Sequence, residues 1–271
     1  MLKYIFLSLI VFMTTLSGSI LKEKIENIIG NREYKIHQNL IGLIFKNENR
    51  YIINDNINYY SLVKELKANG LLKLRFNKPK DITIEFKSLS QSLKAYKTLT
   101  DTMKSLGYRH FFTKSLNKKD DILTWKIIFK TEYMLDPVFL LKELKLKHCK
   151  VLNIENRASD YWYYEIDFDN SILNQAKKIE KNEKVKFHKP LHPYLLIVDE
   201  ISSLEIRSHS LNNWFPNITF FDKDLKILNV IKKNKIYRKY KVIAPENTKY
   251  IKISDLYNLI NIKRGLTIIV R

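Results

Sequence analysis

The spacing of hydrophobic residues changes along the chain, and each spacing indicates a different structure. In residues 20–70, hydrophobic residues recur every three or four positions, as they do on one face of a helix. Two such faces consist of Leu21, Ile25, Ile28 and Ile29, and of Ile36, Leu40, Leu43 and Ile44. A third helix begins near Tyr59 and ends at Asn69–Gly70, residues that typically close a helix. We therefore predict a helical segment over residues 20–70 whose apolar faces pack on the residues that follow.

Residues 71–169 alternate between strand patterns and helix patterns. Strands are predicted at residues 81–86, 108–114, 122–130, 149–155 and 161–168, and a helix at residues 90–106. A second helix begins at Asp136–Pro137, where the aspartate caps the helix and proline occupies its first position. The order β-α-β-β-α-β is that of a ferredoxin-like domain, here with an extra C-terminal strand. In such a domain two helices cover one face of an antiparallel sheet.

The last third of the chain has short strand patterns. Residues 170–191 are rich in lysine and predict a basic, helical linker. Residues 192–271 contain six or seven stretches in which apolar and polar residues alternate, separated by turns such as Asp222–Asp224 and Ala244–Asn247. Strands without helices close as two sheets around one core. We predict an all-β sandwich here, and an α+β fold class for the whole chain.

Residues 1–19 have the features of a secretory signal peptide. Lys3 precedes an apolar run from Tyr4 to Met13, and small residues precede a charged segment, which predicts cleavage after Ser19. The apolar run is short for a membrane-spanning helix, which needs about 20 apolar residues, although the segment could also be kept as an N-terminal anchor. With no later apolar stretch of that kind, we expect a periplasmic protein without a transmembrane span after cleavage.

The formal net charge of +20 is the strongest global feature of the composition. A basic surface attracts nucleic acids, anionic lipids or acidic glycans. Lysines are distributed along the whole chain, however, and the densest run, residues 177–189, is interleaved with Glu180 and Glu183. A solvated segment explains this run better than a nucleic-acid site, which would gather charge on one face. We therefore expect no nucleic-acid partner.

Few residue patterns indicate catalysis, a metal or a cofactor. Cys149 is the single cysteine, so neither an intramolecular disulfide nor a cysteine metal cluster can form. His188 and His192 have a spacing that resembles that of metal ligands, but Pro190 and Pro193 prevent the helical turn that would bring the two rings together. Neither a Gly-x-Ser-x-Gly motif nor a glycine-rich phosphate loop is present. We expect no metal, no cofactor and no catalytic residue.

One arrangement of carboxylates keeps a hydrolase open as an alternative. Glu165 and Asp167 alternate along the last predicted strand of residues 71–169, so their side chains share one face about 6 to 7 Å apart. Such a pair could act as acid and base. Pairing with Lys or Arg residues on neighbouring strands is the competing explanation.

Between Trp214 and Asp255, the chain contains in order an aromatic strand, an Asp-Lys-Asp turn, an alternating strand, a Pro-Glu-Asn turn and the segment Tyr-Ile-Lys-Ile-Ser. This order resembles the galactose-binding-like jelly-roll modules of cell-surface and phage-tail proteins. The resemblance implies a jelly-roll-like β-sandwich, and no sugar-binding residue follows from it. Aromatic rings in this region that could stack on a sugar are those of Trp214, Phe215, Tyr237 and Tyr257. The polar positions are rich in lysine, so a ligand of this module is expected to be acidic.

The chain as a whole resembles periplasmic proteins of Campylobacter-like bacteria, through its signal peptide and phrases such as MLDPVFLLKELK and NTKYIKISDLYNLINIKRGLTI. This resemblance implies a location in a Gram-negative cell envelope. Our leading hypothesis is a non-enzymatic binding or scaffold protein of the envelope, with an envelope protein or an acidic glycan as partner. A carbohydrate-binding protein that uses the C-terminal sandwich is the first alternative, and an envelope hydrolase is the second.

Overall fold

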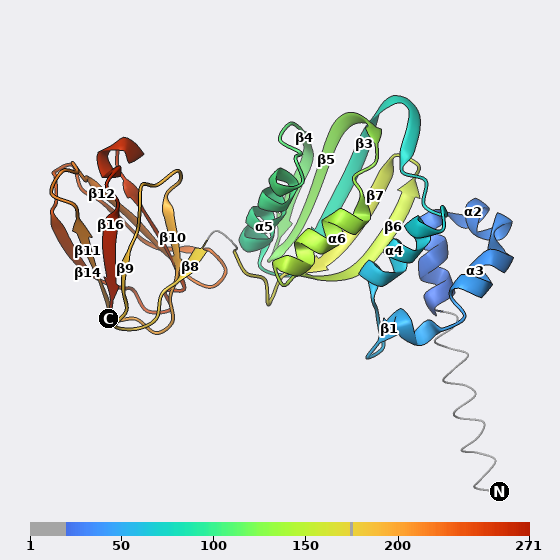
Figure 1. Cartoon of the computed structure of the whole chain (residues 1–271), viewed down its shortest axis with the longest axis horizontal. Coiled ribbons are helices and arrows are strands. Elements are labelled where there is room, and N and C mark those ends of the chain that lie inside the picture. The colour runs from blue at the N-terminus through green and yellow to red at the C-terminus, as the bar shows by residue number, and fades with distance from the viewer. Residues whose placement is uncertain (1–19, 174–175) are drawn as a thin grey trace, which may run out of the picture. The chain divides into compact units, whose positions relative to one another are not determined.

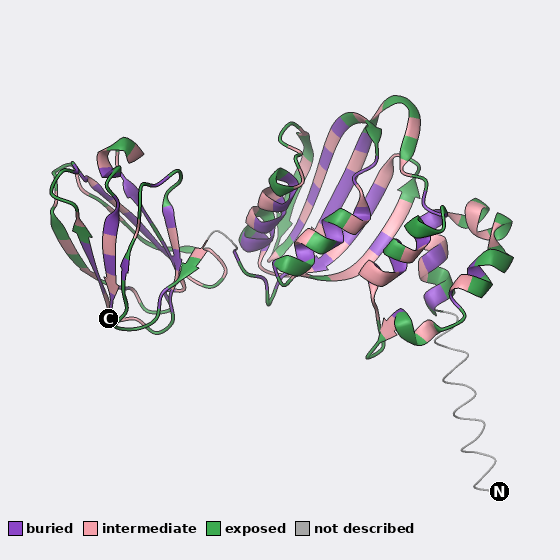
Figure 2. Cartoon of the chain, in the orientation of Figure 1, coloured by how far each residue is buried: buried purple, intermediate pink, exposed green. Residues whose placement is uncertain are grey.

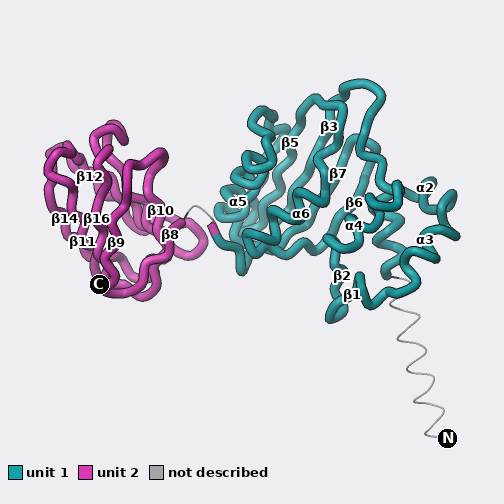
Figure 3. Tube along the Cα trace, viewed as in Figure 1, with its two compact units in different colours: residues 1–172 teal, residues 173–271 magenta. Residues whose placement is uncertain are grey.

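The computed structural model describes residues 20–173 and 176–271, and the signal peptide expected at residues 1–19 lies outside them. The chain forms two compact units, unit 1 (Met1–Ile172) and unit 2 (Leu173–Arg271), as Figure 3 shows. Each unit has its own hydrophobic core. Helices occur with a sheet in unit 1 and strands dominate unit 2, so the predicted α+β class is confirmed. No helix among the described residues has the length and apolar character needed to span a membrane.

Unit 1 is built on a five-stranded sheet with the order β4-β5-β3-β7-β6. The strands are β3 (Arg75–Ser88), β4 (Phe112–Lys119), β5 (Ile122–Tyr133), β6 (Lys150–Ala158) and β7 (Tyr161–Asp167). Helices α5 (Ser92–Ser105) and α6 (Pro137–Leu146) lie on the same face of it (Figure 1). Buried residues alternate with more exposed ones along β5, because successive side chains of a strand point to opposite faces (Figure 2). The buried set packs under the helices.

The predicted antiparallel sheet is wrong at one pair of strands. β7 lies beside β3 and runs parallel to it, from Thr83 opposite Tyr161 to Ser88 opposite Ile166, while β6 is at the edge. The side chains explain this order, because most of β7 is buried whereas β6 carries many polar and half-exposed residues. An apolar strand is stabilised by neighbours on both sides, and a polar strand suits an edge.

The helical segment of residues 20–70 belongs to the same core as this sheet. It contains a helix at residues 20–29, α2 (Asn31–Ile36), α3 (Gln38–Ile44), η1 (Glu48–Arg50), the short strands β1 (Ile52–Ile53) and β2 (Asn56–Ile57), and α4 (Tyr59–Ala68). α4 packs against α6 and β6. Its first residue, Tyr59, donates a hydrogen bond from its hydroxyl to Asn153 Oδ1 of β6 at 3.1 Å. The predicted end of this helix at Asn69–Gly70 is confirmed, since Gly70 has a φ of 70°.

Unit 2 consists of two sheets whose inward side chains share one hydrophobic core. The five-stranded sheet has the order β13-β12-β15-β10-β8 and the four-stranded sheet has the order β14-β11-β16-β9. The strands are β8 (Ala176–Lys178), β9 (Lys184–Lys186), β10 (Tyr194–Ile197), β11 (Ser203–Ser208), β12 (Pro216–Phe221), β13 (Ile227–Lys232), β14 (Lys239–Ile243), β15 (Tyr250–Asp255) and β16 (Leu266–Val270), with the short helix η2 (Leu259–Ile262) before β16. The strands predicted from the alternating pattern of residues 192–271 are therefore confirmed.

The prediction of a helical linker at residues 170–191 is wrong. β8 pairs in parallel with β10, and β9 pairs with β16 in antiparallel orientation, so this segment contributes one strand to each sheet of unit 2. Ile179 and Val185 are buried in the core of unit 2. Their burial stabilises an extended chain whose lysines point outward. The lysine-rich composition of the segment does not by itself indicate this alternation.

Candidate binding surfaces

The four aromatic residues expected to bind a sugar come from loops that meet at one end of unit 2. The backbone N–H of Tyr237 donates to the carbonyl of Trp214 at 2.9 Å, and that of Leu256 donates to the carbonyl of Phe215 at 2.8 Å. The carboxylate of Asp255 joins the loops by accepting hydrogen bonds from the backbone of Phe215 and of Tyr257. The structure therefore brings these residues together, through hydrogen bonds between segments distant in sequence.

Trp214 is nevertheless a core residue. Its side chain is fully buried, and its indole N–H donates to the carbonyl of Ser254 at 3.0 Å. A buried ring cannot stack on a sugar, so the expected ligand role of Trp214 is corrected to a structural one. Phe215 packs edge to face with Tyr257 at a centroid distance of 5.0 Å, and Tyr237 packs in the same way with Tyr240 at 5.2 Å. Edge-to-face pairs do not provide a common flat platform for a sugar ring.

The carboxylates considered for a hydrolase have structural partners. Glu165 forms an ion pair with Lys87 at 3.1 Å across the two neighbouring strands β7 and β3. Asp167 accepts a hydrogen bond from the backbone N–H of Asp169 at 2.8 Å. Nearby on the same sheet, Glu85 forms ion pairs with Arg157 at 3.1 Å and with Lys126 at 3.3 Å. Ion pairing of this kind supports the explanation that neighbouring basic residues neutralise the strand carboxylates.

Cys149 and the histidines show no arrangement typical of catalysis or metal binding. Burial raises the pKa of the Cys149 thiol to about 12, so the thiol stays protonated near neutral pH and is a poor nucleophile. Within residues 20–173 and 176–271, no group of three or more His, Cys, Asp or Glu side chains is placed to hold a metal ion.

The outward face of the four-stranded sheet in unit 2 concentrates positive charge. Residues directly opposite each other on β9, β16, β11 and β14 form cross-strand rows. One row consists of Lys186, Thr267, Arg207 and Lys239, and the next row consists of Lys184, Ile269, Glu205 and Lys241. The five basic residues of these rows are exposed. The residues that alternate with them along the strands point the opposite way, into the core. We call these outward side chains of β9, β11, β14 and β16 the basic face.

Glu205 is the one acidic residue in these four described strands, and it organises the cations around it. Its carboxylate is 2.6 Å from Arg207 Nε, 3.3 Å from Lys239 Nζ and 3.7 Å from Arg271 Nη2. The hydrogen bond from Arg207, together with the one from Lys239, lowers the pKa of Glu205 below its ordinary value. One carboxylate thus fixes the positions of three cations and leaves the face with a large excess of positive charge.

A hollow of about 330 Å³ lies at the end of the basic face, between β9, β11 and β16. It is lined by Lys184, Lys186, Arg207, Ser208, His209, Arg264, Gly265, Leu266 and Thr267. Gly265 has a φ of 80°, and a Cβ atom at this position would overlap with the carbonyl oxygen of Phe187. Only glycine permits this close approach of the two chain segments, which places Arg264 beside the lysines of β9.

The five-stranded sheet of unit 2 has no comparable basic row. Its outward lysines are separated, since Lys178, Lys232 and Lys252 lie in three different cross-strand rows. The lysine-rich polar positions between Trp214 and Asp255 are therefore divided between the two sheets, with Lys232 and Lys252 on one and Lys239 and Lys241 on the other. Sequence reasoning missed Lys184 and Lys186 because they stood in the expected linker, although the Lys-Val-Lys alternation of β9 was a signal for a strand.

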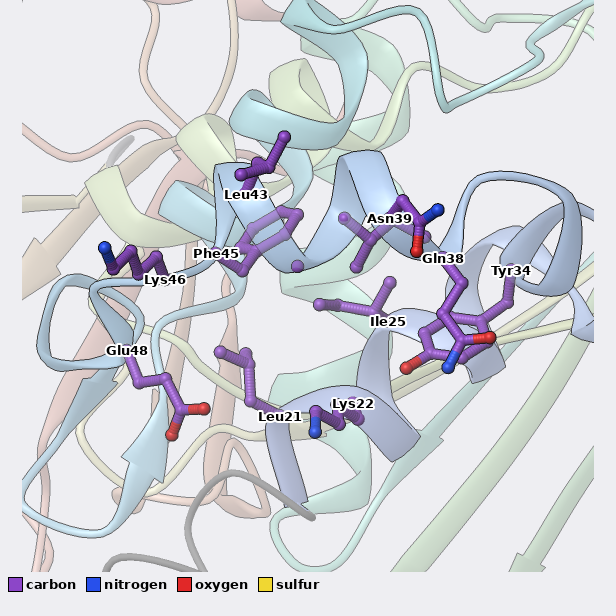
Figure 4. Close-up of a pocket in the computed structure, with 12 residues that line it drawn as sticks. Leu21, Lys22, Ile25, Tyr34, Gln38, Asn39, Leu43, Phe45, Lys46 and Glu48 are labelled. Atoms are coloured by element: carbon purple, nitrogen blue, oxygen red, sulfur yellow. The ribbon is translucent and has the colours of Figure 1, made fainter.

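A second surface, in unit 1, is a groove of about 630 Å³ with a mixed apolar and polar lining, between the helix at residues 20–29 and α3. Leu21 and Ile25 line it on one side and Phe45 on the other (Figure 4). Leu43 is 75% exposed beside it, which corrects the expectation that Leu43 packs in the core. α2 and α3 are separate helices that meet at His37, so Ile41 and Phe45 are buried in place of the predicted face.

Comparison with known proteins identifies no family for this sequence. No protein-family model matches the sequence, and no curated protein matches it either. The function is therefore inferred from the geometry of the surfaces described above.

Proposed function

We propose that this chain is a non-enzymatic binding protein of the Gram-negative cell envelope, and that its C-terminal unit holds an acidic ligand such as an acidic glycan. The basic face is the observation that carries this proposal. Clustering on one side of a sheet raises the local concentration of anions more than the same charge spread over the surface does. Export by residues 1–19, with cleavage after Ser19, and a periplasmic location are parts of the same proposal.

Two features of the architecture support a binding role. Unit 2 has two sheets around one core, which favours the jelly-roll-like sandwich that its resemblance to galactose-binding-like modules implies. In unit 1 the element order from β3 to β6 is β-α-β-β-α-β, which favours a ferredoxin-like domain in which β7 has entered the sheet beside β3. Both architectures serve many binding proteins, and their sites are decided by side chains.

Binding of polygalacturonate tests the proposal, with neutral dextran as the comparison. We expect the chain from Ile20 onward to bind polygalacturonate and not dextran, and to bind several-fold more weakly at 150 mM salt than at 50 mM. The double variant Lys239→Gln/Lys241→Gln should lose at least about fivefold in affinity, because each removed ion pair with the ligand is worth of order 1 kcal/mol.

The matched control is Lys232→Gln/Lys252→Gln, which removes the same charge from the five-stranded sheet. Both residues are exposed and lie outside the basic face. Equal weakening by the two double variants would show that only net charge matters. Such a result, or equal binding of dextran, would overturn the proposed role of the basic face.

The groove of unit 1 between the helix at residues 20–29 and α3 favours a second, protein-binding role, consistent with a scaffold. Leu21, Ile25 and Phe45 in its lining, with the exposed Leu43, suit apolar side chains of an envelope protein, and the polar residues of the lining suit polar groups beside them. A partner recovered from envelope extracts by the wild type should be lost with Leu43→Asp and kept with Ile260→Asp, a similarly exposed position of unit 2. A partner that both variants retain would exclude the groove. We do not propose a hydrolase, because Glu165 and Asp167 are engaged with Lys87 and with the backbone.

A further inference from the structure

We propose that the hollow at the end of the basic face is a seat for a phosphate monoester group, carried by a sugar or by a lipid. This inference rests on the proposed function, because it names the chemical group that the basic face recognises. The reasons are the charge of the hollow, the direction of its hydrogen-bonding groups and its size.

Three of the four basic residues that line the hollow have no acidic partner among the described residues. Lys184, Lys186 and Arg264 form no ion pair with any described residue, and no acidic side chain lines the hollow. The carboxylate of the neighbouring strand position, Glu205, is already shared by three cations. Several unpaired cations around one small hollow favour a ligand group with more than one negative charge.

Arg207 is oriented for a ligand by its contact with Glu205. The carboxylate of Glu205 accepts a hydrogen bond from Arg207 Nε at 2.6 Å and holds the guanidinium in place. The two terminal nitrogens of Arg207 stay available to donate hydrogen bonds to a ligand. A guanidinium fixed in this way can donate two parallel hydrogen bonds to neighbouring oxygens of one anionic group. Glu205 is therefore a positioning residue for the hollow.

Other groups that line the hollow can also donate hydrogen bonds. His209 Nδ1 accepts a hydrogen bond from the backbone N–H of Leu211 at 3.1 Å, so the ring nitrogen that carries a proton for donation is Nε2. Thr267, which lies beside Arg207 in the outward row, also lines the hollow, and its hydroxyl group can donate a hydrogen bond. A lining of donors complements a group that has only acceptors.

A phosphate monoester matches this lining better than a carboxylate does. It carries a charge of about −1.5 to −2 at neutral pH and three strong acceptor oxygens, whereas a carboxylate has one charge and two oxygens. The volume of about 330 Å³ accommodates such a group together with part of the molecule that carries it. The remainder of the ligand would extend along the row formed by Arg207 and Lys239.

Calorimetric titration of the chain from Ile20 onward tests this assignment with glucose 6-phosphate, inorganic phosphate and glucuronate. We expect glucose 6-phosphate to bind at least about tenfold more tightly than glucuronate, because hydrogen bonds between charged groups are the strong ones. The triple variant Lys184→Gln/Lys186→Gln/Arg264→Gln should lose at least about tenfold in affinity for glucose 6-phosphate. The control Lys232→Gln/Lys252→Gln should stay within about twofold, because its residues lie far from this row.

Vesicles distinguish the two sources of the group. Binding to vesicles that contain phosphatidic acid, with no binding of glucose 6-phosphate and none to phosphatidylcholine vesicles, would assign the seat to a lipid phosphate. Binding of glucose 6-phosphate would assign it to a phosphorylated sugar. Circular dichroism of the triple variant verifies that unit 2 is folded, and Arg264→Gln alone provides a milder test if the triple variant is not.

Separate results overturn the inference and the proposed function. Binding of polygalacturonate without competition by glucose 6-phosphate or by phosphatidic acid vesicles would leave the acidic-ligand function in place and reject the phosphate seat. Measurable binding of both glucuronate and glucose 6-phosphate with equal affinities, or an unchanged affinity of the triple variant for the phosphate ligand that binds the wild type, would reject it as well. Failure of every acidic probe to bind would reject both.

Discussion

Trp214 illustrates how the surroundings of a single residue decide its role. Its indole is fully buried and hydrogen-bonded to Ser254, whereas Tyr257 is 65% exposed. We expect Trp214→Ala to lower the free energy of unfolding of unit 2 by about 3 to 5 kcal/mol, because it leaves a large cavity. Tyr257→Ala should cost about 1 kcal/mol, the value of its contact with Phe215. Urea denaturation of both variants measures the difference, and equal stabilities would contradict it.

Two glycines with a similar backbone conformation should respond differently to alanine. Gly70 and Gly265 both have positive φ, but a Cβ atom meets no neighbour within 4 Å at Gly70 and overlaps with Phe187 at Gly265. Gly70→Ala should cost unit 1 about 1 kcal/mol for the left-handed conformation alone. Gly265→Ala should cost unit 2 at least about 2 kcal/mol more, because the backbone has to move apart. Thermal unfolding of each unit is the measurement; similar costs would show that the contact with Phe187 is easily relieved.

At the scale of elements, the basic face depends on one carboxylate shared between strands β11 and β14. The pKa of Glu205 in the folded protein is lowered from 4.5, chiefly by its hydrogen bond from Arg207. A lowered pKa means that the stabilisation is complete above pH 4.5 and is lost as the pH falls through the folded-state value. We therefore expect Glu205→Gln to melt below the wild type at pH 7, with a gap that narrows as the pH falls below about 4.5.

Melting curves of wild type and Glu205→Gln between pH 7 and pH 3 test this expectation. Glu246→Gln serves as the control, since Glu246 is exposed in the loop between β14 and β15. A gap that stays constant with pH would show that Glu205 does not stabilise the strands through its charge.

At the scale of the whole molecule, the two separate hydrophobic cores predict two folding units. The core of unit 1 contains residues between Leu21 and Phe168, and the core of unit 2 contains residues between Ile179 and Val270. We expect residues 173–271 expressed alone to fold into a β protein with a cooperative thermal transition. Trp214→Ala in the full chain should then shift this transition and leave that of unit 1 in place. A fragment without a cooperative transition would contradict independent folding.

The amino-acid sequence by itself determined most of the helices and strands. Alternation of apolar and polar residues predicts β10 to β16, and Asp136 followed by Pro137 predicts the start of α6, where the Asp136 side chain accepts a hydrogen bond from the backbone of Val138 at 2.9 Å. These signals act between residues close in sequence. They are therefore present before any long-range contact forms.

The tertiary structure alone decided which of these elements meet. Whether β7 lies beside β3, whether Trp214 is buried, and whether Lys186 stands in one row with Arg207 and Lys239 all depend on pairings between distant segments. Strand register assigns each side chain to a face and to a neighbour, and a shift by one residue would exchange the two faces. A basic face with a hollow for an anion is therefore a property of the paired strands, although every lysine in it is visible in the sequence.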